Sequence, residues 1–472
     1  KTIQTCGLLL GNKLKRTLIV LPISVMNQWK DTLAKLLPDS KVHIHHGGSK
    51  IKNLEHFVNL GCDIILTTIG LVSSTNNILH KIPWNRVVID EVHYIRNPNS
   101  KSFQRAKELK SDIKWGLTGT PIQNSIKDIQ TLYKFVFSVK NTINITNKTL
   151  NSAQLDILNK IYLKRRNKST VKQLEELDKN IEFHDITIEF ETEEEFAIYT
   201  KIKNNTTNEL KKVTESNLSV REQMVVIFEL ILRLRQTSIH PQIAINSLTS
   251  KFHNTLALDD FKGISSKYNQ VLRLVKEKSM KKQNTIVFCY FREEMEGLSK
   301  LLSDNGVRNR IYNGSMSMKQ KEEVLSDFTH TRSLMELQLI SKKYSDIPSC
   351  CMDMISSNIP KVLLIQIKCG AVGLNLQQFN NIIFTSPDWN PTNQFQAIAR
   401  AHRIGQNMKI NVYNINLTHK QFFTIDDRII DIQHKKNKII EQILKEDVFN
   451  LNTQTKTFTP KLDYLDYTSI LS

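Results

Sequence analysis

The sequence is short of the residue patterns that mark secreted, zinc-bound or membrane proteins. Its 472 residues include six cysteines, which form no C-x-x-C pair, so we predict neither a disulfide framework nor a zinc module. Cys350 and Cys351 are adjacent but have no histidine nearby in the sequence. No apolar run approaches the roughly 20 residues of a membrane span, and no secretory signal is visible at the start. We expect reduced thiols, a nuclear or cytosolic protein and no membrane partner.

Acidic residues are too few to balance the basic ones. The 65 lysines and arginines exceed the 46 aspartates and glutamates, which gives a formal net charge of +19. Such a charge is typical of proteins that bind a polyanion, most often nucleic acid. Lysine outnumbers arginine by 48 to 17 and glycine is scarce, a bias that A/T-rich codons also produce. The charge therefore supports a nucleic-acid partner, while a lysine-rich source such as a protist or a large DNA virus remains an alternative cause.

Short β-branched runs alternate with helical patterns in two separate stretches of the chain. Buried strands that alternate with helices predict a parallel sheet covered on both faces. The stretch between them is polar and helix-rich, with one strand-like segment at 184–190. The fold class predicted is therefore α/β with two parallel-sheet lobes, a helical linker region and a C-terminal helix. The expected strands are 17–22, 42–46, 63–68, 86–91 and 113–120 in the first lobe, and 284–290, 310–315, 361–367, 381–386 and 409–415 in the second.

The stretch VVIDEVHYIRN (87–97) gives the strongest local signal. An apolar strand that ends in Asp90 and Glu91 places two carboxylates at the carboxyl edge of a parallel sheet, where ligands bind in open α/β folds. In a nucleotide hydrolase Asp90 would hold Mg²⁺ and Glu91 would orient and polarise the attacking water. The same ending is also common at ordinary turns, and a histidine such as His93 is more often structural, so this motif alone leaves both interpretations open.

Three further stretches carry weaker signals of the same chemistry. LTGTPIQN (117–124) follows a strand with a tight hydroxyl-bearing loop, which suits a sensor of the γ-phosphate but is also ordinary turn chemistry. QFQAIARAHRIGQ (394–406) sets Arg400 and Arg403 on one helical face, as arginine fingers or as a solvated basic face. Lys1 and Thr2 match the end of a phosphate-binding loop, G-x-x-x-x-G-K-S/T, whose glycines do not precede them in the printed chain.

The order of these motifs resembles that of the Swi/Snf-type ATPases, the DNA translocases and chromatin remodellers of helicase superfamily two. The resemblance extends from Lys1 to about Leu444. The linker stretch is similar to the branch linked to post-replication repair and transcription termination, although the cysteines of that branch's RING module are missing. Besides DEVH and LTGTPIQN, the matching stretches are TLIVLPISVMNQWKDTL (17–33), ILTTIG (65–70), LRLRQTSIHP (232–241), TIVFCYFREEMEGLSKLL (285–302), YNGSMSMKQKEEVLSDF (312–328), GAVGLNLQQFNNIIFTSPDWNP (370–391) and QAIARAHRIGQ (396–406).

The resemblance implies two RecA-like lobes with ATP and Mg²⁺ in the cleft between them. Lys1 would contact the β- and γ-phosphates, Thr2 and Asp90 would hold the metal, and Glu91 would act as the base. Hydrolysis would reopen a cleft that ATP binding closes, and so move the lobes along DNA. Because a loop without its glycine amides cannot cradle phosphates, the chain as printed is expected to bind ATP poorly. The remaining implied residues are His93 and Gly373 for the nucleotide, Thr118, Gly119 and Thr120 for coupling, and Gln396, Arg400 and Arg403 for catalysis from the second lobe.

The resemblance also implies contacts with double-stranded DNA, made mostly to phosphates and therefore with little sequence preference. Trp389 would insert or stack at a groove, although a core tryptophan is an equally physical explanation. Nucleosomes or other DNA-bound proteins are implied as further partners. The residues that match the family's DNA-contacting positions are Ser24, Gln28, Thr67, Thr68, Gly314, Ser315, Lys368, Gly370 and Trp389.

The chain departs from the family's pattern in two places. Gln366, Cys369 and Ala371 stand where serine or threonine, alanine and glycine are usual, and the extra β-carbon of Ala371 restricts a backbone that glycine leaves free. Residues 329–360 resemble an insertion. The domains predicted are a first lobe at 1–137, a helical linker region at 138–265, a second lobe at 266–418, a brace helix at 419–446 and a tail at 447–472.

The function predicted is ATP-driven translocation on double-stranded DNA, without necessarily separating its strands. Two other functions fit the same motifs: a strand-separating DNA or RNA helicase, and a catalytically idle scaffold that binds DNA. The intact DEVH stretch and both arginines weigh against the scaffold, because an idle site has no physical need for that arrangement of charges. The location expected is the nucleus, or the cytoplasmic replication site of a large DNA virus.

Overall fold

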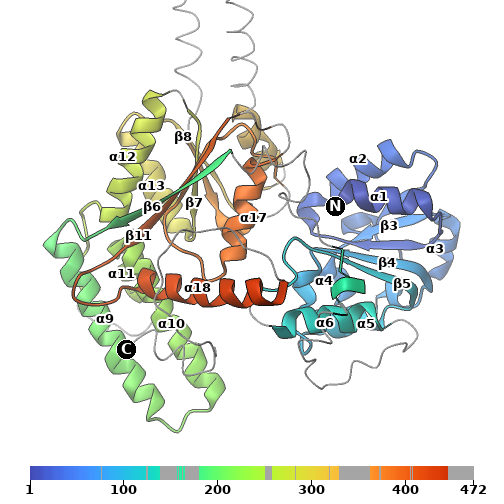
Figure 1. Cartoon of the computed structure of the whole chain (residues 1–472), viewed down its shortest axis with the longest axis horizontal. Helices are drawn as coiled ribbons and strands as arrows, with labels where there is room; N and C mark the ends of the chain where they lie inside the picture. The colour runs from blue at the N-terminus through green and yellow to red at the C-terminus, as the bar shows by residue number, and fades with distance from the viewer. Residues whose placement is uncertain are drawn as a thin grey trace, which may run out of the picture. The chain divides into compact units, whose positions relative to one another are not determined.

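The computed structural model describes residues 1–75, 77–123, 126–138, 157, 159–161, 163–164, 180–249, 258–281, 283–317, 319–328, 362–370, 374–403, 406 and 408–444. Two compact units make up the chain, Lys1–Arg165 with Lys436–Val448 and Arg166–Lys435 with Phe449–Ser472, here called the first and second lobe (Figure 1). The proposed insertion at 329–360, the tail, Gly373 and the paired Cys350 and Cys351 lie outside the described residues.

The first lobe contains a five-stranded sheet in which every pairing is parallel. The strand order is β2-β3-β1-β4-β5. Val20 of β1 pairs with Ile89 of β4, and Asp90 of β4 pairs with Leu117 of β5, so the carboxyl ends of these strands meet at one edge of the sheet. The strands are β1 (Thr17–Val20), β2 (Val42–Ile44), β3 (Ile64–Thr67), β4 (Trp84–Asp90) and β5 (Ser111–Leu117).

Helices cover both faces of this sheet because alternate strand residues point to opposite faces. Ile19, Leu66 and Val88 pack with the helices α1 (Thr2–Gly11) and α2 (Met26–Leu36) on one face. Leu18, Ile65 and Val87 pack on the other face. The helices of this second face are α3 (Leu54–Leu60), α4 (Ile69–Val72), α5 (Lys101–Glu108) and α6 (Ile126–Val136), with the short turns η1 (Ile23–Val25), η2 (Gly47–Ser49), η3 (Ile78–His80) and η4 (Val92–Ile95) in the connections.

A buried arginine connects the end of α1 to the strand β4. The side chain of Arg86 is fully buried, donates from Nη2 to the carbonyl oxygen of Asn12 (3.0 Å), and lies 4.6 Å above the ring of Trp115. Asn12 is the C-cap of α1, where the helix dipole favours a positive charge. Burial lowers the pKa of Arg86 below its ordinary value. The contact therefore anchors α1 to the strand that ends in the two carboxylates.

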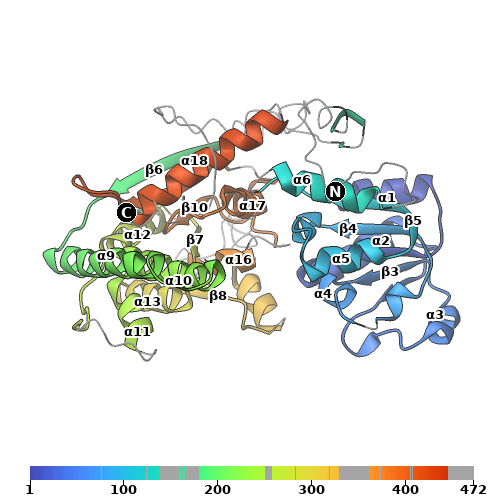
Figure 2. The same ribbon diagram turned by 90° about the horizontal axis from the view of Figure 1, so that it is seen from below.

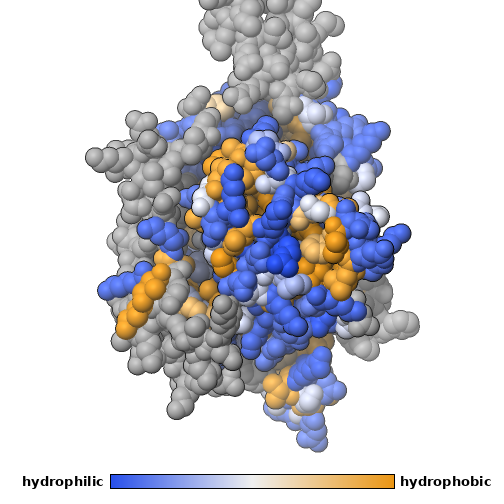
Figure 3. Space-filling view, turned by 90° about the vertical axis from the view of Figure 1, so that its right-hand side faces the viewer, coloured by the Kyte–Doolittle hydropathy of each residue, from blue (hydrophilic) through white to orange (hydrophobic). Residues whose placement is uncertain are grey.

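The surface of the first lobe mixes apolar and hydrophilic side chains. Ile3 and Leu8 of α1 and Val58 of α3 are more than half exposed. Figure 3 shows apolar side chains set among hydrophilic ones on one face of the molecule. Because apolar atoms form more than half of a typical protein surface, this mixture is ordinary.

The second lobe contains a six-stranded, all-parallel sheet of order β6-β11-β10-β7-β9-β8. Its edge strand β6 comes from the stretch predicted as a linker region and pairs with β11 over eight residues. The linker stretch therefore contributes to the second sheet. The strands are β6 (Ile181–Ile188), β7 (Thr285–Cys289), β8 (Asn309–Tyr312), β9 (Val362–Gln366), β10 (Asn381–Phe384) and β11 (Ile410–Leu417).

Helices again cover both faces of the second sheet. Val287, Leu364 and Ile383 pack with α12 (Ser266–Met280) and α13 (Arg292–Asp304), whereas the alternate residues of the strands pack with α17 (Pro391–Ala401). A separate helical core joins α9, α10, α11 and the start of α18, and Figures 1 and 2 show α9 and α10 side by side. The bounds are α9 (Glu193–Thr214), α10 (Val220–Ile239), α11 (Pro241–Thr249), α16 (Ile367–Gly370) and α18 (Ile425–Leu444).

A buried ion pair joins these layers of the second lobe. Nζ of Lys267 in α12 lies 2.5 Å from Oδ2 of Asp426 in α18, and both side chains are almost completely buried. The other donors to the Asp426 carboxylate are the hydroxyls of Ser238 and Ser386 and the amide of Leu417. Burial lowers the pKa of Lys267, which the negative charge of Asp426 opposes. The Asp426 carboxylate of α18 is thus in contact with α10, α12, β11 and the segment after β10.

The structure confirms the predicted fold class, and it contains a strand at each predicted position. Two all-parallel sheets covered by helices are what the alternation of apolar strands and helices predicts. Among the described residues, no helix is long and apolar enough to cross a membrane.

Replacing Lys267 by methionine is expected to destabilise the second lobe by about 3 kcal/mol, because the Asp426 carboxylate would stay buried without its cation. The measurement is the free energy of unfolding in urea. The matched control is Lys281→Met, since Lys281 forms an ion pair with Glu277 at the surface, where both side chains are largely exposed. Equal stabilities of the two variants would contradict the role assigned to the buried pair.

The first lobe is expected to lose stability on acidification through His45. Its buried Nδ1 accepts a hydrogen bond from the amide of Ile51 (2.9 Å), and burial lowers its pKa from 6.5 to about 4. Between these values the unfolded chain binds a proton that the folded chain does not, so stability falls as the pH drops below 6.5, by about 2 kcal/mol at pH 5. Urea unfolding at pH 7 and pH 5 measures the loss. His45→Asn keeps an acceptor that does not titrate, and its loss should be smaller; an unchanged loss would exclude His45 as the cause.

Candidate active site

Residues from three separate segments meet at the carboxyl edge of the first sheet. Lys1 is the N-cap of α1, and its Nζ lies 3.6 Å from Oε1 of Glu91, which directly follows β4. The same Nζ would lie 3.5 Å from a Cβ atom added to Gly119, in the loop after β5. The structure therefore brings together the lysine, the acidic pair and the LTGT loop that the sequence predicts to form one site.

The Asp90 carboxylate is held by two hydrogen bonds. Its Oδ2 accepts from the indole Nε1 of Trp29 in α2 (3.0 Å), and its Oδ1 accepts from the backbone amide of Glu91 (3.0 Å). Burial, and then the negative charge of Glu91, raise the pKa of Asp90 above its ordinary value, while Lys1 and the two donors oppose this shift. The Asp90 carboxylate therefore favours a further positive charge beside it, in addition to that of Lys1.

Glu91 has a backbone conformation that is unusual for its residue type. Its φ of 49° and ψ of 50° lie in the left-handed region, at the start of η4. Non-glycine residues in that region carry a steric cost and are concentrated at functional sites. The conformation turns the chain sharply after the strand, so that Asp90 and Glu91 both reach the edge of the sheet.

A histidine connects Glu91 to the loop after β5. His93 is buried, and its Nδ1 lies 3.2 Å from Oε2 of Glu91 and 3.2 Å from Oγ1 of Thr118. The hydroxyl of Thr118 accepts a hydrogen bond from the amide of Thr120 (3.1 Å). A continuous polar chain thus runs from Lys1 through Glu91 and His93 to the loop predicted to couple hydrolysis to motion.

The loop is fixed at both of its ends. A Cβ atom on Gly116 would lie 3.0 Å from the side chain of Val92, so any other residue would require Val92 in η4 to shift. On the other side, the amide of Gln123 donates to Oδ2 of Asp128 in α6 (2.9 Å). The position of the loop beside the acidic pair therefore depends on both contacts.

The residues present suit Mg²⁺ together with a phosphate ligand. The described residues contain no group of three or more His, Cys, Asp and Glu side chains that could hold a metal alone. Mg²⁺ is commonly bound by one or two carboxylates with substrate phosphates and water, which matches a single acidic pair. Asp90 would hold such an ion with the half-buried Thr2 of the first turn of α1, and Lys1 would contact the phosphates.

The predicted catalytic residues of the second lobe lie on and just after α17. The helix is capped by the side chain of Asn390, contains Gln396 and Arg400, and ends at Ala401. The prediction that Arg400 and Arg403 share one helical face is therefore wrong, because the backbone leaves the helical conformation at His402. Nε of Arg403 donates to the carbonyl oxygen of Ala399 (3.1 Å). Burial, and then the charge of Arg400, lower the pKa of Arg403 to about 10, so its guanidinium group is charged at neutral pH.

The predicted DNA contacts of the first lobe differ in exposure. Ser24 in η1 and Gln28 in α2 are exposed, and Thr68 is half-buried after β3. Thr67 is fully buried, because its side chain points into the lobe and its hydroxyl donates to the carbonyl oxygen of His45 (3.2 Å). Of the two threonines, only Thr68 therefore has its side chain at the surface.

In the second lobe, two of the segments predicted to contact DNA lie next to each other. Gly314 and Ser315 are exposed after β8, and a Cβ on Gly314 would lie 3.4 Å from Sγ of Cys369 in α16. Lys368 is exposed on the same short helix, which ends at Gly370. Trp389 is half-buried against the helical core of α9, α10 and α18, where a core tryptophan would pack. Part of its side chain stays accessible.

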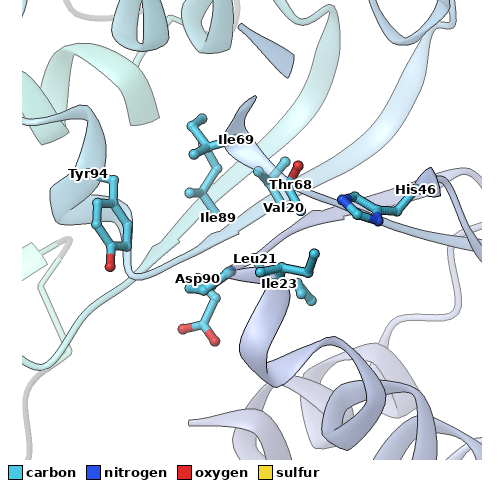
Figure 4. Close-up of a pocket in the computed structure, with 10 residues that line it drawn as sticks. Val20, Leu21, Ile23, His46, Thr68, Ile69, Ile89, Asp90 and Tyr94 are labelled. Atoms are coloured by element: carbon cyan, nitrogen blue, oxygen red, sulfur yellow. The ribbon is translucent and has the colours of Figure 1, made fainter. Parts of the chain in front are cut away.

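A hollow of about 260 Å³ lies beside Asp90 at the same edge of the sheet. Apolar side chains such as Ile69 and Ile89 line it, with the rings of Tyr94 and His46 on opposite sides, as Figure 4 shows. The hollow lies between the ends of β1, β3 and β4. It therefore adjoins both the acidic pair and the predicted DNA-contacting segments.

Two buried residues of the site were not identified from the sequence. Trp29 and Arg86 contact Asp90 and the end of α1, respectively. The sequence gives a signal only for Trp29, which shares the apolar face of its helix with Met26 and Leu33. That spacing predicts burial but not the partner of the indole N–H.

Comparisons with known proteins match this organisation. The SNF2-related domain family matches residues 1–243, and the helicase conserved C-terminal domain family matches residues 266–341 and 351–405. An uncharacterized ATP-dependent helicase of Mycoplasma genitalium is 28% identical over 440 residues, which cover 92% of this chain and 37% of the relative. The ATP-dependent DNA helicase DDM1 of Arabidopsis thaliana is 23% identical, covering 98% of this chain and 60% of the relative.

Among solved structures, the SWI2/SNF2 ATPase core of Sulfolobus solfataricus in complex with dsDNA shares 22% identity at a TM-score of 0.37, covering 94% of this chain and 86% of that one. The chain spans 37%, 39% and 60% of the lengths of three curated relatives that match it over more than nine-tenths of its own length.

Replacing Glu91 by glycine is expected to stabilise the first lobe by about 1 kcal/mol, because glycine adopts the left-handed conformation without the steric cost. The measurement is thermal unfolding of the purified protein. Glu91→Gln is the matched control, since it removes the charge but keeps the strained backbone. A glycine variant no more stable than the glutamine variant would show that the turn stores no strain.

Proposed function

The chain belongs to the SNF2-related domain family, and on that basis we propose that it is the ATP-hydrolysing core of a translocase that moves along double-stranded DNA. The observation that carries the proposal is the polar chain from Lys1 through Glu91 and His93 to Thr118. A DNA-binding scaffold without hydrolysis has no need for a strained glutamate between a lysine and a sensing loop. The net charge of +19 supports a polyanionic partner.

In this proposal each residue has one task in the hydrolysis of ATP. Lys1 and the amides at the start of α1 hold the phosphates, and Asp90 with Thr2 holds Mg²⁺, which neutralises charge on the phosphates when bound. Glu91 orients and polarises the attacking water from the position beside Lys1. His93 links the Glu91 carboxylate to the hydroxyl of Thr118, so that a movement of the loop changes the position of the base.

The second lobe supplies the positive charge that the first lobe lacks in this proposal. Arg400 lies near the end of α17 and Arg403 just after it, and their guanidinium groups suit contacts with phosphate oxygens. Gln396 precedes Arg400 on the same helix. If catalysis requires these groups, hydrolysis depends on closure of the two lobes, and this dependence couples it to movement.

Duplex DNA is proposed as the track, with contacts at Ser24, Gln28, Thr68, Gly314, Ser315 and Lys368. These residues present backbone amides, hydroxyls, an amide side chain and one lysine, groups that bind phosphates and carry little sequence information. Their exposure in each lobe supports the assignment. Trp389 is proposed as a further contact through the exposed part of its side chain.

Hydrolysis should be stimulated about tenfold or more by duplex DNA and far less by single strands or RNA of equal length. The assay is phosphate release by the encoded protein, including whatever residues its gene places before Lys1. Glu91→Gln should lose at least about 100-fold of the activity, the size of a general-base contribution, while keeping its affinity for duplex.

A triplex-displacement assay distinguishes a translocase from a helicase. We expect the protein to displace a third strand bound to a duplex and to leave the two strands of that duplex paired. Absence of stimulation by duplex would exclude the proposal. Separation of the duplex strands would favour a helicase, and hydrolysis-free binding that is indifferent to Glu91→Gln would favour a scaffold.

A further inference from the structure

A single buried side chain connects the helix α2 to the acidic pair. The side chain of Trp29 is 1% exposed, and its Nε1 donates to Oδ2 of Asp90 across 3.0 Å. The other oxygen of Asp90 accepts from the amide of the next residue, Glu91, so it moves with the strand itself. Of these two hydrogen bonds, the one from Trp29 is therefore the one that ties the carboxylate to a separate element of the lobe.

The first turn of this helix and the turn η1 that leads into it present polar side chains to solvent. Ser24 in η1 and Gln28 in α2 are exposed, whereas Met26, Trp29 and Leu33 are buried. Gln28 directly precedes Trp29 in the helix, and its carbonyl oxygen accepts from the hydroxyl of Thr32 (2.7 Å). A ligand that contacts Ser24 and Gln28 therefore binds the short rigid element that carries the donor to Asp90.

The packing around Trp29 leaves little room for the ring to move independently of its helix. Its neighbours in the core include Met26, Leu33, Leu21 and Val88, all at most 5% exposed. Because buried side chains are closely packed, a displacement of α2 moves the indole N–H by a comparable amount. Hydrogen bonds weaken steeply with misalignment, so a small shift of α2 changes how firmly Asp90 is held.

Trp84 shows what a purely structural tryptophan looks like in the same lobe. It is 2% exposed, and its Nε1 donates to the backbone carbonyl oxygen of Leu79 (2.9 Å), in a connection remote from the acidic pair. Both tryptophans fill the core and satisfy their N–H. Of the two, only Trp29 donates its N–H to a carboxylate at the ligand-binding edge of the sheet.

We propose that Trp29 is a positioning residue that couples duplex binding at Ser24 and Gln28 to the carboxylate of Asp90. Duplex on α2 fixes the helix, the helix fixes the indole N–H, and the N–H fixes the carboxylate that would hold Mg²⁺. The inference rests on the proposed function for the identities of the duplex and the metal. It adds one specific hydrogen bond, from Trp29 to Asp90, through which bound duplex changes the affinity of the metal site.

Coupling of this kind is reciprocal. If duplex raises the affinity of the site for a divalent ion by some factor, the ion must raise the affinity for duplex by the same factor. This can be measured without hydrolysis. Duplex affinity, followed by fluorescence anisotropy at matched ionic strength, is compared in ADP with Mn²⁺ and in ADP alone, with Mn²⁺ and DNA without protein as the blank.

The test uses Trp29→Phe, which keeps an aromatic ring and removes the N–H, and Trp84→Phe as the matched control. In the wild type and in Trp84→Phe, Mn²⁺ with ADP should tighten duplex binding several-fold. In Trp29→Phe this gain should disappear, and the stimulation of ATP hydrolysis by duplex should fall about tenfold, the size of one hydrogen bond to a charged acceptor. The Mg²⁺ concentration for half-maximal hydrolysis should rise in Trp29→Phe alone.

Should Trp29→Phe fail to fold, benzothienylalanine at position 29 replaces the N–H by sulfur and keeps the shape of the indole, and the same loss of coupling is expected. Full coupling in either variant, with the wild type stimulated by duplex, would overturn the inference and leave the proposed function intact. A loss of coupling in Trp84→Phe as large as in Trp29→Phe would also overturn it. A wild type that duplex does not stimulate would overturn both.

Discussion

The partial burial of two adjacent carboxylates at the end of β4 is the constraint on which the first lobe depends. Burial raises the pKa of Asp90, and the adjacent charge of Glu91 raises it further. Lys1 at the start of α1, Trp29 in α2 and the backbone amide of Glu91 offset this cost. The parallel register then places the loop after β5 beside them, because Asp90 pairs with Leu117.

A comparison with Asp426 separates a structural carboxylate from one suited to a ligand. Asp426 is fully buried, accepts hydrogen bonds from two hydroxyls and an amide, and forms an ion pair with Lys267, so both its oxygens are occupied by the protein. Asp90 is half-buried, borders an open hollow, and has one donor for each oxygen. Carboxylate oxygens have several lone pairs, and those of Asp90 leave capacity for a cation. The difference in bonding, and not acidity alone, makes Asp90 the carboxylate that is better suited to a ligand.

Much of this arrangement could be predicted from local sequence, and the exceptions have a common physical origin. Buried parallel strands consist of β-branched runs, so they could be located, and the strand that ends in Asp90 and Glu91 predicted the candidate site. The partner of Trp29, the burial of Thr67 and the pairing of β6 with β11 depend instead on which face a residue takes and which distant segment packs there. These features are tertiary contacts, which a local sequence pattern does not specify. The left-handed backbone of Glu91 is likewise imposed by the turn and has no sequence signal.

The two carboxylates of the acidic pair are held by different elements, and under the proposed function this division would give the first lobe two inputs. Glu91 is connected through His93 to the loop of Thr118, which suits a response to the phosphates. Asp90 is connected through Trp29 to α2, whose exposed residues suit a response to the track. If each carboxylate is productive only when its own support is in place, neither ligand alone completes the site. A requirement for both would keep hydrolysis slow on ATP without DNA, which is what coupling to movement along a duplex requires.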